Sequence, residues 1–164
     1  VVEYVASNDV VCEASDSDGT PYVLQGNLDM YTLENLLRRE NLRKNRHIRR
    51  FIRRMWAVAK SPGTDVVTHS SYVAVVGLIN LVLVPERDGG DLMAAVERDW
   101  RRDSQGSEVL TRRRFADAIF EIADLWCEGV DRWEYIDVLD LIAECVIVDN
   151  GRKPRLRTLQ EASY

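Results

Sequence analysis

Residues 112–148 read RRRFADAIFEIADLWCEGVDRWEYIDVLDLIAECVIV, and this stretch decides how the chain can fold. Apolar residues recur at three- and four-residue spacing before and after a short break, which is the periodicity of two amphipathic helices. The break carries the signature Val130-Asp131-x-x-Glu134-Tyr135, in which the Asp131 side chain can cap the second helix. The stretch therefore predicts a helix, a capped corner and a second helix.

Two related signatures stand upstream, Val67-Thr68-x-x-Ser71-Tyr72 and Leu110-Thr111-x-x-Arg114-Phe115. Each has an apolar residue, a Thr that can serve as an N-cap, and an aromatic residue four positions after the cap. The helices predicted to flank them cover 45–60 and 69–84, then 91–102 and 112–126. The 69–84 segment is apolar nearly all round and also permits a strand, but its length favours a buried helix.

This repeated plan resembles the paired helix-loop-helix units of EF-hand, calmodulin-like domains over residues 45–148. In that family's twelve-residue loop, the eighth residue pairs with the partner loop in a small β-ribbon and the twelfth is a bidentate Glu. The residue after the loop is an aromatic that enters the core. The resemblance places Val67 and Leu110 at the eighth position, with Tyr72 and Phe115 just after the twelfth. It implies a mainly α fold of paired helix-loop-helix (EF-hand-like) units.

The departures from that family concern the calcium ligands. The twelfth positions hold Ser71 and Arg114, and a cation at this place opposes a bound calcium ion. The first, third and fifth positions of the 60–71 loop are Lys60, Pro62 and Thr64, and those of the third unit are Ala123, Leu125 and Cys127. The 103–114 loop keeps Asp103, Gln105 and Ser107 but has Glu108 where the turn glycine belongs. We therefore expect no metal site and no cofactor.

Charge is distributed unevenly along the 164 residues, although the net charge is only −5. Residues 1–37 contain seven acids and no Lys or Arg, whereas residues 38–60 contain ten Lys and Arg and one acid, Glu40. The later part of this basic block predicts an amphipathic helix, with Ile48, Phe51 and Met55 among the residues on its apolar face. The basic block is the strongest electrostatic feature of the sequence.

The predicted partner-binding residues are the arginines on the other face of that helix, together with one tryptophan near a helix start: Arg46, Arg49, Arg50, Arg53, Arg54 and Trp133. An acidic protein surface is the expected partner. An anionic membrane, nucleic acid, or a calmodulin-type protein that binds basic helices are the other partners considered. The helix could instead pack by its apolar stripe alone, with its arginines solvated or paired with the acidic N-terminal segment. The acidic balance of the whole chain argues against nucleic acid.

No catalytic motif is visible: the sequence has no Gly-rich phosphate loop and no GxSxG nucleophile motif. Asp117, Glu121 and Asp124 share one helical face, which we predict to be solvated. The three cysteines do not suggest a disulfide framework, and Cys127 and Cys145 are expected to be buried free thiols. The longest apolar run, 72–84, is shorter than the roughly 20 residues that span a bilayer.

These observations predict an extended or hairpin segment over 1–31, a helical EF-hand-like domain over 32–148 and a basic, mobile C-terminal tail over 149–164. The function predicted for this arrangement is a non-catalytic, calcium-independent protein-interaction or scaffolding module. Residues 120–126 with Tyr135 are loosely similar to helical domains of large cytoskeletal and flagellar proteins, which implies a cytoplasmic and cytoskeletal setting. The alternatives are a calcium-regulated EF-hand module and an enzyme with a dispersed active site.

Overall fold

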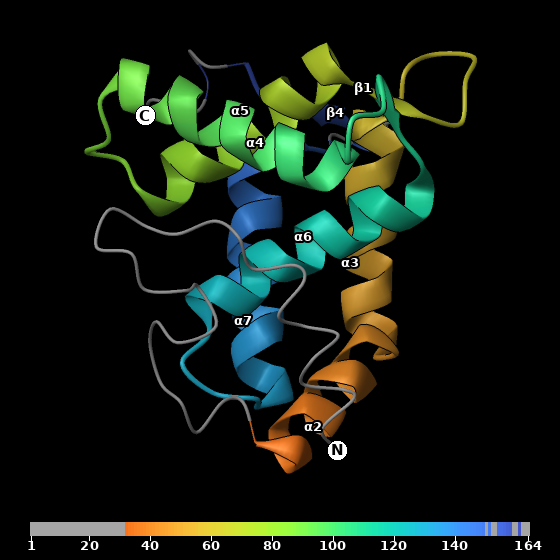
Figure 1. Cartoon of the computed structure of the whole chain (residues 1–164), viewed down its shortest axis with the longest axis vertical. Helices are drawn as coiled ribbons and strands as arrows, with labels where there is room; N and C mark the ends of the chain where they lie inside the picture. Colours follow the sequence, from red (N-terminus) through yellow and green to blue (C-terminus); the bar gives the residue numbers. More distant parts are fainter. Residues whose placement is uncertain (1–31, 150, 152–153, 159–160, 162–164) are drawn as a thin grey trace.

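The computed structural model describes residues 32–149, 151, 154–158 and 161, and over these the fold is mainly α, as predicted (Figure 1). The helices are α2 (Leu33–Arg43), α3 (Arg46–Ala59), α4 (His69–Leu83), α5 (Gly89–Ser104), α6 (Arg112–Trp126) and α7 (Arg132–Val146). Two short antiparallel pairs accompany them, formed by β1 (Val67–Thr68) with β2 (Val109–Leu110) and by β3 (Ile147–Val148) with β4 (Arg155–Leu156). The hairpin expected over 1–31 lies outside the described residues.

Local capping chemistry starts the helices where the three signatures predict. The side chains of Thr68, Thr111 and Asp131 each accept a hydrogen bond from a backbone N–H in the first turn of α4, α6 and α7 respectively. Thr32 does the same for α2. These caps satisfy N–H groups that have no partner within the helix, so each corner is specified by its own short sequence.

The β1–β2 ribbon ties the first two corners together. Val67 pairs with Leu110, and Thr68 pairs with Val109. Val67 and Leu110 are both fully buried, so the ribbon also contributes apolar contacts to the core. The pairing joins two residues 43 positions apart, 110 minus 67, at the places where the signatures put an apolar residue.

One continuous core fills the space between the helices. The aromatic residues that end the three signatures, Tyr72, Phe115 and Tyr135, are all fully buried. Burying a large apolar side chain stabilises a fold by about 1.5–3 kcal/mol, so these positions are among the strongest local contributors. The segment over 69–84 is a helix rather than a strand, and α5 and α7 both pack against it.

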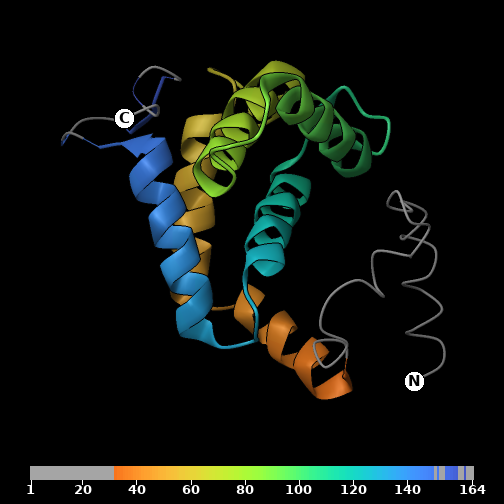
Figure 2. The ribbon, with the colours of Figure 1, turned by 90° about the vertical axis from the view of Figure 1, so that its left-hand side faces the viewer.

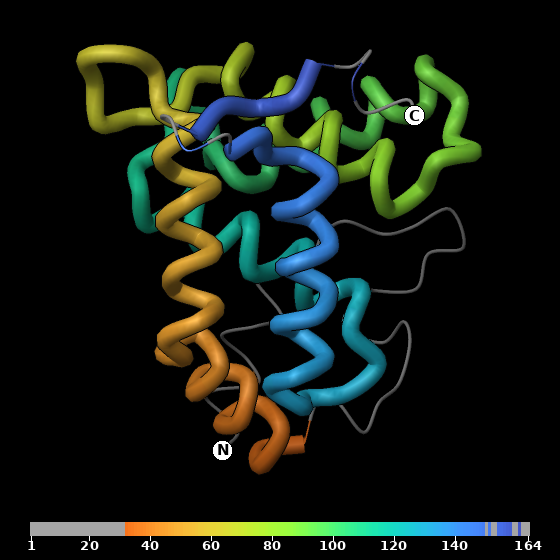
Figure 3. Tube along the Cα trace, turned by 180° about the vertical axis from the view of Figure 1, so that it is seen from behind, coloured from red at the N-terminus to blue at the C-terminus, as the bar shows by residue number. Residues whose placement is uncertain are grey.

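The helices form two sets that meet at the core. Figure 3 shows α3 and α7 side by side and running in the same direction, on one face of the molecule. Figure 2 shows α4 and α5 across the upper end of this pair, α2 at its lower end and α6 to the right of it. Contacts of α6 with both α3 and α7 close the core from that side. This arrangement leaves the outer sides of α3 and α7 facing away from the core.

Three expectations about element boundaries are corrected by the structure. Helix α5 begins at Gly89 rather than residue 91, because Asp88 caps it by accepting a hydrogen bond from the Gly90 N–H at 2.8 Å. It ends at Ser104, where Gln105 and Gly106 take left-handed backbone conformations. Part of the tail that we expected to be mobile is the strand β4, which pairs with β3.

The C-terminal strand β4 is held in place by the end of α7 and by β3, which continues directly from α7. Ile147 pairs with Leu156, whose side chain packs against the core. The backbone N–H of Arg157 donates to the Val146 carbonyl at 2.8 Å, and its guanidinium donates to the Glu144 carbonyl at 3.0 Å. Helix carbonyls at a C-terminus lack partners in the helix itself, so residues outside α7 satisfy them here. The composition of the tail gave no sign of this pairing.

Candidate protein-contact surface

The corner between α5 and α6 is closed by the side chain of Arg114. Its guanidinium donates to the Ser104 carbonyl at 2.7 Å and to Oε1 of Gln105 at 3.1 Å. Both acceptors lie in the turn that ends α5, where the helix dipole favours a positive charge. Arg114, which the EF-hand resemblance would place at the twelfth loop position, therefore supplies an internal cation at the corner.

The first position of the same loop, Asp103, is also fully engaged by protein groups. Its Oδ2 accepts from the hydroxyl of Tyr72 at 2.6 Å, and its Oδ1 accepts from Nε of Arg102 at 2.9 Å. Burial and the nearby Asp103 carboxylate raise the pKa of the Tyr72 hydroxyl well above its usual value, so the phenol stays protonated as the donor. This contact links α4 to the end of α5.

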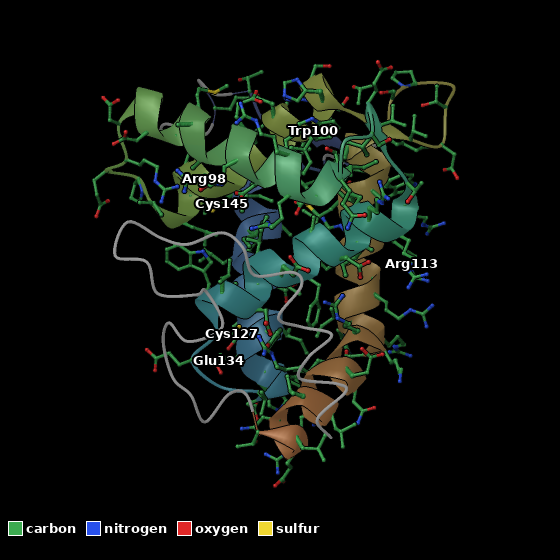
Figure 4. The ribbon with its side chains drawn as sticks, in the orientation of Figure 1. Arg98, Trp100, Arg113, Cys127, Glu134 and Cys145 are labelled. Carbon is green, nitrogen blue, oxygen red and sulfur yellow. The ribbon has the colours of Figure 1, made fainter. Side chains whose placement is uncertain are left out.

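The corner between α6 and α7 is closed by the Glu134 carboxylate. Its Oε2 accepts from the Gly129 N–H at 3.1 Å, and its Oε1 accepts from the Glu128 N–H. Figure 4 shows Glu134 and Cys127 next to each other at this corner. Burial, with a smaller contribution from Glu134, raises the pKa of the Cys127 thiol to about 12, so this thiol is protonated at neutral pH. Cys145, in contrast, is only partly buried.

Backbone hydrogen bonds within the protein close the 60–71 segment. In the 60–71 loop, the Ser61 N–H donates to the Val66 carbonyl at 3.0 Å and the Thr64 N–H donates to the Ser61 carbonyl at 3.1 Å. Within the part of the chain that the structure describes, no group of three or more His, Cys, Asp or Glu side chains is placed to hold a metal ion.

The basic block divides between two helices with different roles. In α2, Arg39 pairs with Asp124 of α6, and Arg43 pairs with Asp117 of α6 at 2.7 Å. The prediction of a solvated face is therefore wrong for Asp124, whose side chain is only 14% exposed beside Arg39, whereas the Asp117 side chain stays 47% exposed although it pairs with Arg43. The Arg43 guanidinium also lies over the Phe120 ring, 4.2 Å from its centroid.

The arginines of α3 have no such partners. Arg46, Arg49, Arg50 and Arg53 are exposed and Arg54 is half-buried. None of the five forms an ion pair or a side-chain hydrogen bond with another described residue. The opposite side of α3, including Ile48, Phe51 and Met55, is buried in the core. The five predicted contact residues of α3 therefore form a charged outer face on a helix that the core holds in place; we call them the arginine face.

Trp133 lies at the start of α7 and is 55% exposed. The guanidinium of its neighbour Arg132 lies over the indole, 4.6 Å from the ring centroid. Helix α7 packs beside α3, so the structure places Trp133 on a helix next to the arginine face although 79 positions, 133 minus 54, separate it from Arg54. The sequence predicted these residues individually but did not predict that two neighbouring helices would carry them.

An acidic face on α7 is a feature that the sequence reasoning missed. Asp137, Asp140 and Glu144 are exposed, and none forms an ion pair or side-chain hydrogen bond within the described part of the chain. Their spacing of three, four and seven residues puts them on one side of the helix, which was a readable signal. We call these three residues the acidic face.

A hollow of about 440 Å³ lies where α3, α7 and β3 meet. The residues that line it are Arg54, Asp140, Ala143, Glu144, Ile147, Val148, Asp149 and Arg157. It therefore contains the last arginine of the arginine face and two carboxylates of the acidic face. The two faces meet at this hollow, so Arg54 lies at about the same level along the axis of α3 as Asp140 and Glu144 do along the parallel axis of α7.

A second hollow of about 430 Å³ is lined mainly by residues of α5 and of the turn that follows it, with His69 of α4. The His69 Nε2 lies 2.8 Å from Oε1 of Glu97, and its ring meets the edge of Trp100 with centroids 5.1 Å apart. Both interactions hold the imidazole between α4 and α5.

Comparison with protein-family models, with curated proteins and with solved structures finds no match to this chain. Among the described helices, none combines the length and the apolar character that crossing a membrane requires, and the strongly apolar α4 has 15 residues.

Proposed function

We propose that this chain is a non-catalytic, calcium-independent protein-interaction or scaffolding module. Its contact surface is the arginine face of α3, with Trp133 at the edge, and its partner is a protein with an acidic surface. The observation that carries this proposal is that five arginines share the outer face of a core-anchored helix and find no carboxylate among the described residues.

The chemistry of arginine supports an acidic partner. A guanidinium presents several N–H donors in a planar fork and can bind a carboxylate through two parallel hydrogen bonds. The arginines of α2 pair with carboxylates inside the fold, where Arg39 contacts both oxygens of Asp124 and Arg43 donates to one oxygen of Asp117. The arginine face has the same donors on the outer side of a helix that need not reorganise, so binding loses little backbone conformational entropy.

We further propose that the helix-loop-helix units are EF-hand-like and have lost calcium binding. The pairing of Val67 with Leu110 and the burial of Tyr72 and Phe115 fit that plan. The contacts made by Arg114 explain how a corner of this kind closes without an ion. The setting that we propose is cytoplasmic, in a cytoskeletal or flagellar assembly, and it rests on the similarity of residues 120–126 and Tyr135 to helical domains of such proteins.

Calcium at about 1 mM, well above the range in which EF-hand sensors respond, is expected to leave the purified chain unchanged. The reason is that Arg114 and Asp103 are already engaged with protein groups, and a guanidinium repels a divalent cation. Isothermal titration calorimetry should give no saturable heat, and tryptophan fluorescence should not shift. Saturable binding below the millimolar range would instead support the calcium-regulated alternative.

The interaction itself is tested by capture from native extract, with either calcium or a chelator present. The test variant carries Arg50→Glu and Arg53→Glu. The matched control carries Arg112→Glu and Arg113→Glu, which changes the charge equally at two exposed arginines at the start of α6 that pair with no other described residue. We expect the same partner with wild type and control in both conditions, and at least roughly tenfold less with the test variant, because close ion pairs at interfaces contribute about 1.5 kcal/mol or more.

Circular dichroism of both variants must show the wild-type helical content for this comparison to count. Equal capture by the test variant and the control would contradict the arginine face as the contact surface. Unfolding of the test variant alone would show that Arg50 and Arg53 are needed internally, which is the competing explanation of the basic helix.

A further inference from the structure

The arginine face and the acidic face lie on neighbouring helices and meet at one hollow. Helices α3 and α7 lie side by side and run in the same direction (Figure 3), and Arg54 lines the same hollow as Asp140 and Glu144. The arginines lie on one helix and the carboxylates on the other, and neither set is neutralised by another described residue. The two neighbouring helices therefore carry opposite charges.

The charged residues of the two faces also lie at matching levels along the axes of α3 and α7. Arg54 lines the same hollow as Asp140 and Glu144, which fixes the level of one turn of α3 against one turn of α7. About one helical turn earlier, four residues back from Arg54 and three back from Asp140, the residues are Arg50 and Asp137. A further turn back gives Arg46 on α3 and the exposed Trp133 on α7.

We propose that the partner of this surface is a second copy of the chain, related by a two-fold axis parallel to α3 and α7. The proposal rests on the proposed function, because it names the occupant of the same arginine face. The axis places α3 of one copy over α7 of the other at unchanged height. Arg50 then faces Asp137 of the second copy, Arg54 faces Asp140 and Glu144, and Arg46 faces the Trp133 ring.

Symmetry selects this arrangement over others. A two-fold axis that lies in the contact plane but crosses the helices would place α3 on α3, so arginines would face arginines. The axis along the helices instead satisfies both halves of the surface at once, since each copy offers a basic helix to the other's acidic helix. An arginine over an indole contributes a cation–π interaction of about 0.5–1 kcal/mol at an exposed site.

The size of the surface limits the strength of the dimer. Helices of 14 and 15 residues are about 21–22 Å long, and neighbouring axes lie about 8–10 Å apart. The shared face is then roughly 20 by 20 Å, or about 400 Å² per copy and about 800 Å² in total, which is below the roughly 1,000 Å² of a stable interface and in the range of weak, transient contacts. We therefore expect a dissociation constant of about 10–100 µM at low salt, and because the contact is mainly ionic, at least roughly tenfold weaker association in about 500 mM salt.

Sedimentation equilibrium of the full chain at about 100 µM, in about 50 mM and about 500 mM sodium chloride, tests this proposal. The first variant is Arg50→Glu with Arg54→Glu, which places two acids opposite Asp137 and Asp140 of the second copy. The second variant is Asp137→Arg with Asp140→Arg, which makes both faces basic. Each alone is expected to be monomeric, and an equimolar mixture is expected to form a heterodimer, because the substituted acids of one variant then face the substituted arginines of the other and the remaining contact keeps the wild-type pairs.

A variant that fails to fold could not form the heterodimer, so heterodimer formation also shows that both variants fold. The neutral variant Asp137→Asn with Asp140→Asn should dimerise more weakly than wild type but should still dimerise. A monomeric wild type at low salt, or a mixture of the two variants that stays monomeric, overturns the second copy as the partner. Extract capture that still depends on Arg50 and Arg53 would leave the proposed function standing in that case. Failure of both measurements would remove the arginine face as a contact surface.

Discussion

Replacing Asp124 by Asn is expected to lower the free energy of unfolding by about 2–4 kcal/mol, measured by urea denaturation. Asp124 accepts hydrogen bonds from Nε of Arg39 at 2.8 Å and from the hydroxyl of the fully buried Tyr135. The Arg39 and Asp124 side chains are only 17% and 14% exposed, so water solvates the Arg39 guanidinium poorly once the Asp124 charge is removed. Asn keeps the volume but removes the negative charge that faces the guanidinium of Arg39, which is the costly way to break a buried pair.

A second carboxylate on the same helix provides the matched control. Asp117 pairs with Arg43 at 2.7 Å, and this pair also joins α6 to α2. The Asp117 side chain is 47% exposed, so solvent screens the interaction. Asp117→Asn is therefore expected to cost less than about 1 kcal/mol, the usual range for exposed ion pairs. The two substitutions differ in burial far more than in chemistry.

A double-mutant cycle with Arg39→Met separates the pair from its surroundings. The two single variants should each be destabilised, and the double variant should recover part of the loss, because no buried charge is left without its partner. If Asp124→Asn and Asp117→Asn cost the same, burial does not control these pairs, and α2 is less tightly held to α6 than the structure indicates.

Asp124 also shows where sequence reasoning fails for this chain. Three carboxylates at helical spacing were expected to face solvent, and nothing near them in the sequence contradicts that. Arg39 is 85 positions away, so only the packing of α2 over α6 brings the two charges together. The same holds for the acidic face, since the charges on α7 were readable from their spacing but their position beside α3 depends on the tertiary fold.

Features set by short-range chemistry were predicted well. The caps formed by Thr68, Thr111 and Asp131 need only a side-chain oxygen and a backbone N–H two or three residues later. The periodicity of α3 identified both its buried side and its arginine face. The β4 strand was missed because its pairing with β3 depends on the end of α7, and a basic tail has no local pattern that announces such a contact.

Replacing Phe115 by Ala is expected to lower the free energy of unfolding by about 3–5 kcal/mol, the range found for large-to-small changes in well-packed cores. Phe115 follows β2 and the cap of α6, is fully buried, and meets the edge of Trp56 with ring centroids 5.6 Å apart. The side chain thus joins α6 to α3 directly beneath the ribbon. Phe115→Leu keeps most of the volume and should cost less than about 1.5 kcal/mol.

An exposed position on the same helix provides the comparison for Phe115→Ala. Leu125→Ala removes an apolar side chain from the same helix at a position that is 51% exposed, and it should cost less than about 0.5 kcal/mol. Chemical denaturation followed by far-ultraviolet circular dichroism and by tryptophan fluorescence gives both stabilities, because Trp56 reports directly on the contact. Similar losses for Phe115→Ala and Leu125→Ala would mean that the core does not depend on the corner aromatic.

Arg114→Ala measures how much the hydrogen bonds of the turn contribute to this corner, compared with the core packing of Phe115. Arg114 and Phe115 are adjacent, but one closes the turn through two hydrogen bonds and the other fills the core. Loss of partly exposed hydrogen bonds should cost about 0.5–1.5 kcal/mol, well below the loss for Phe115→Ala. In a corner that depended on an ion, the residue at the ligand position would dominate in the presence of that ion. Here the expected order is the reverse, with or without calcium, because apolar packing rather than coordination fixes the geometry on which the arginine face is built.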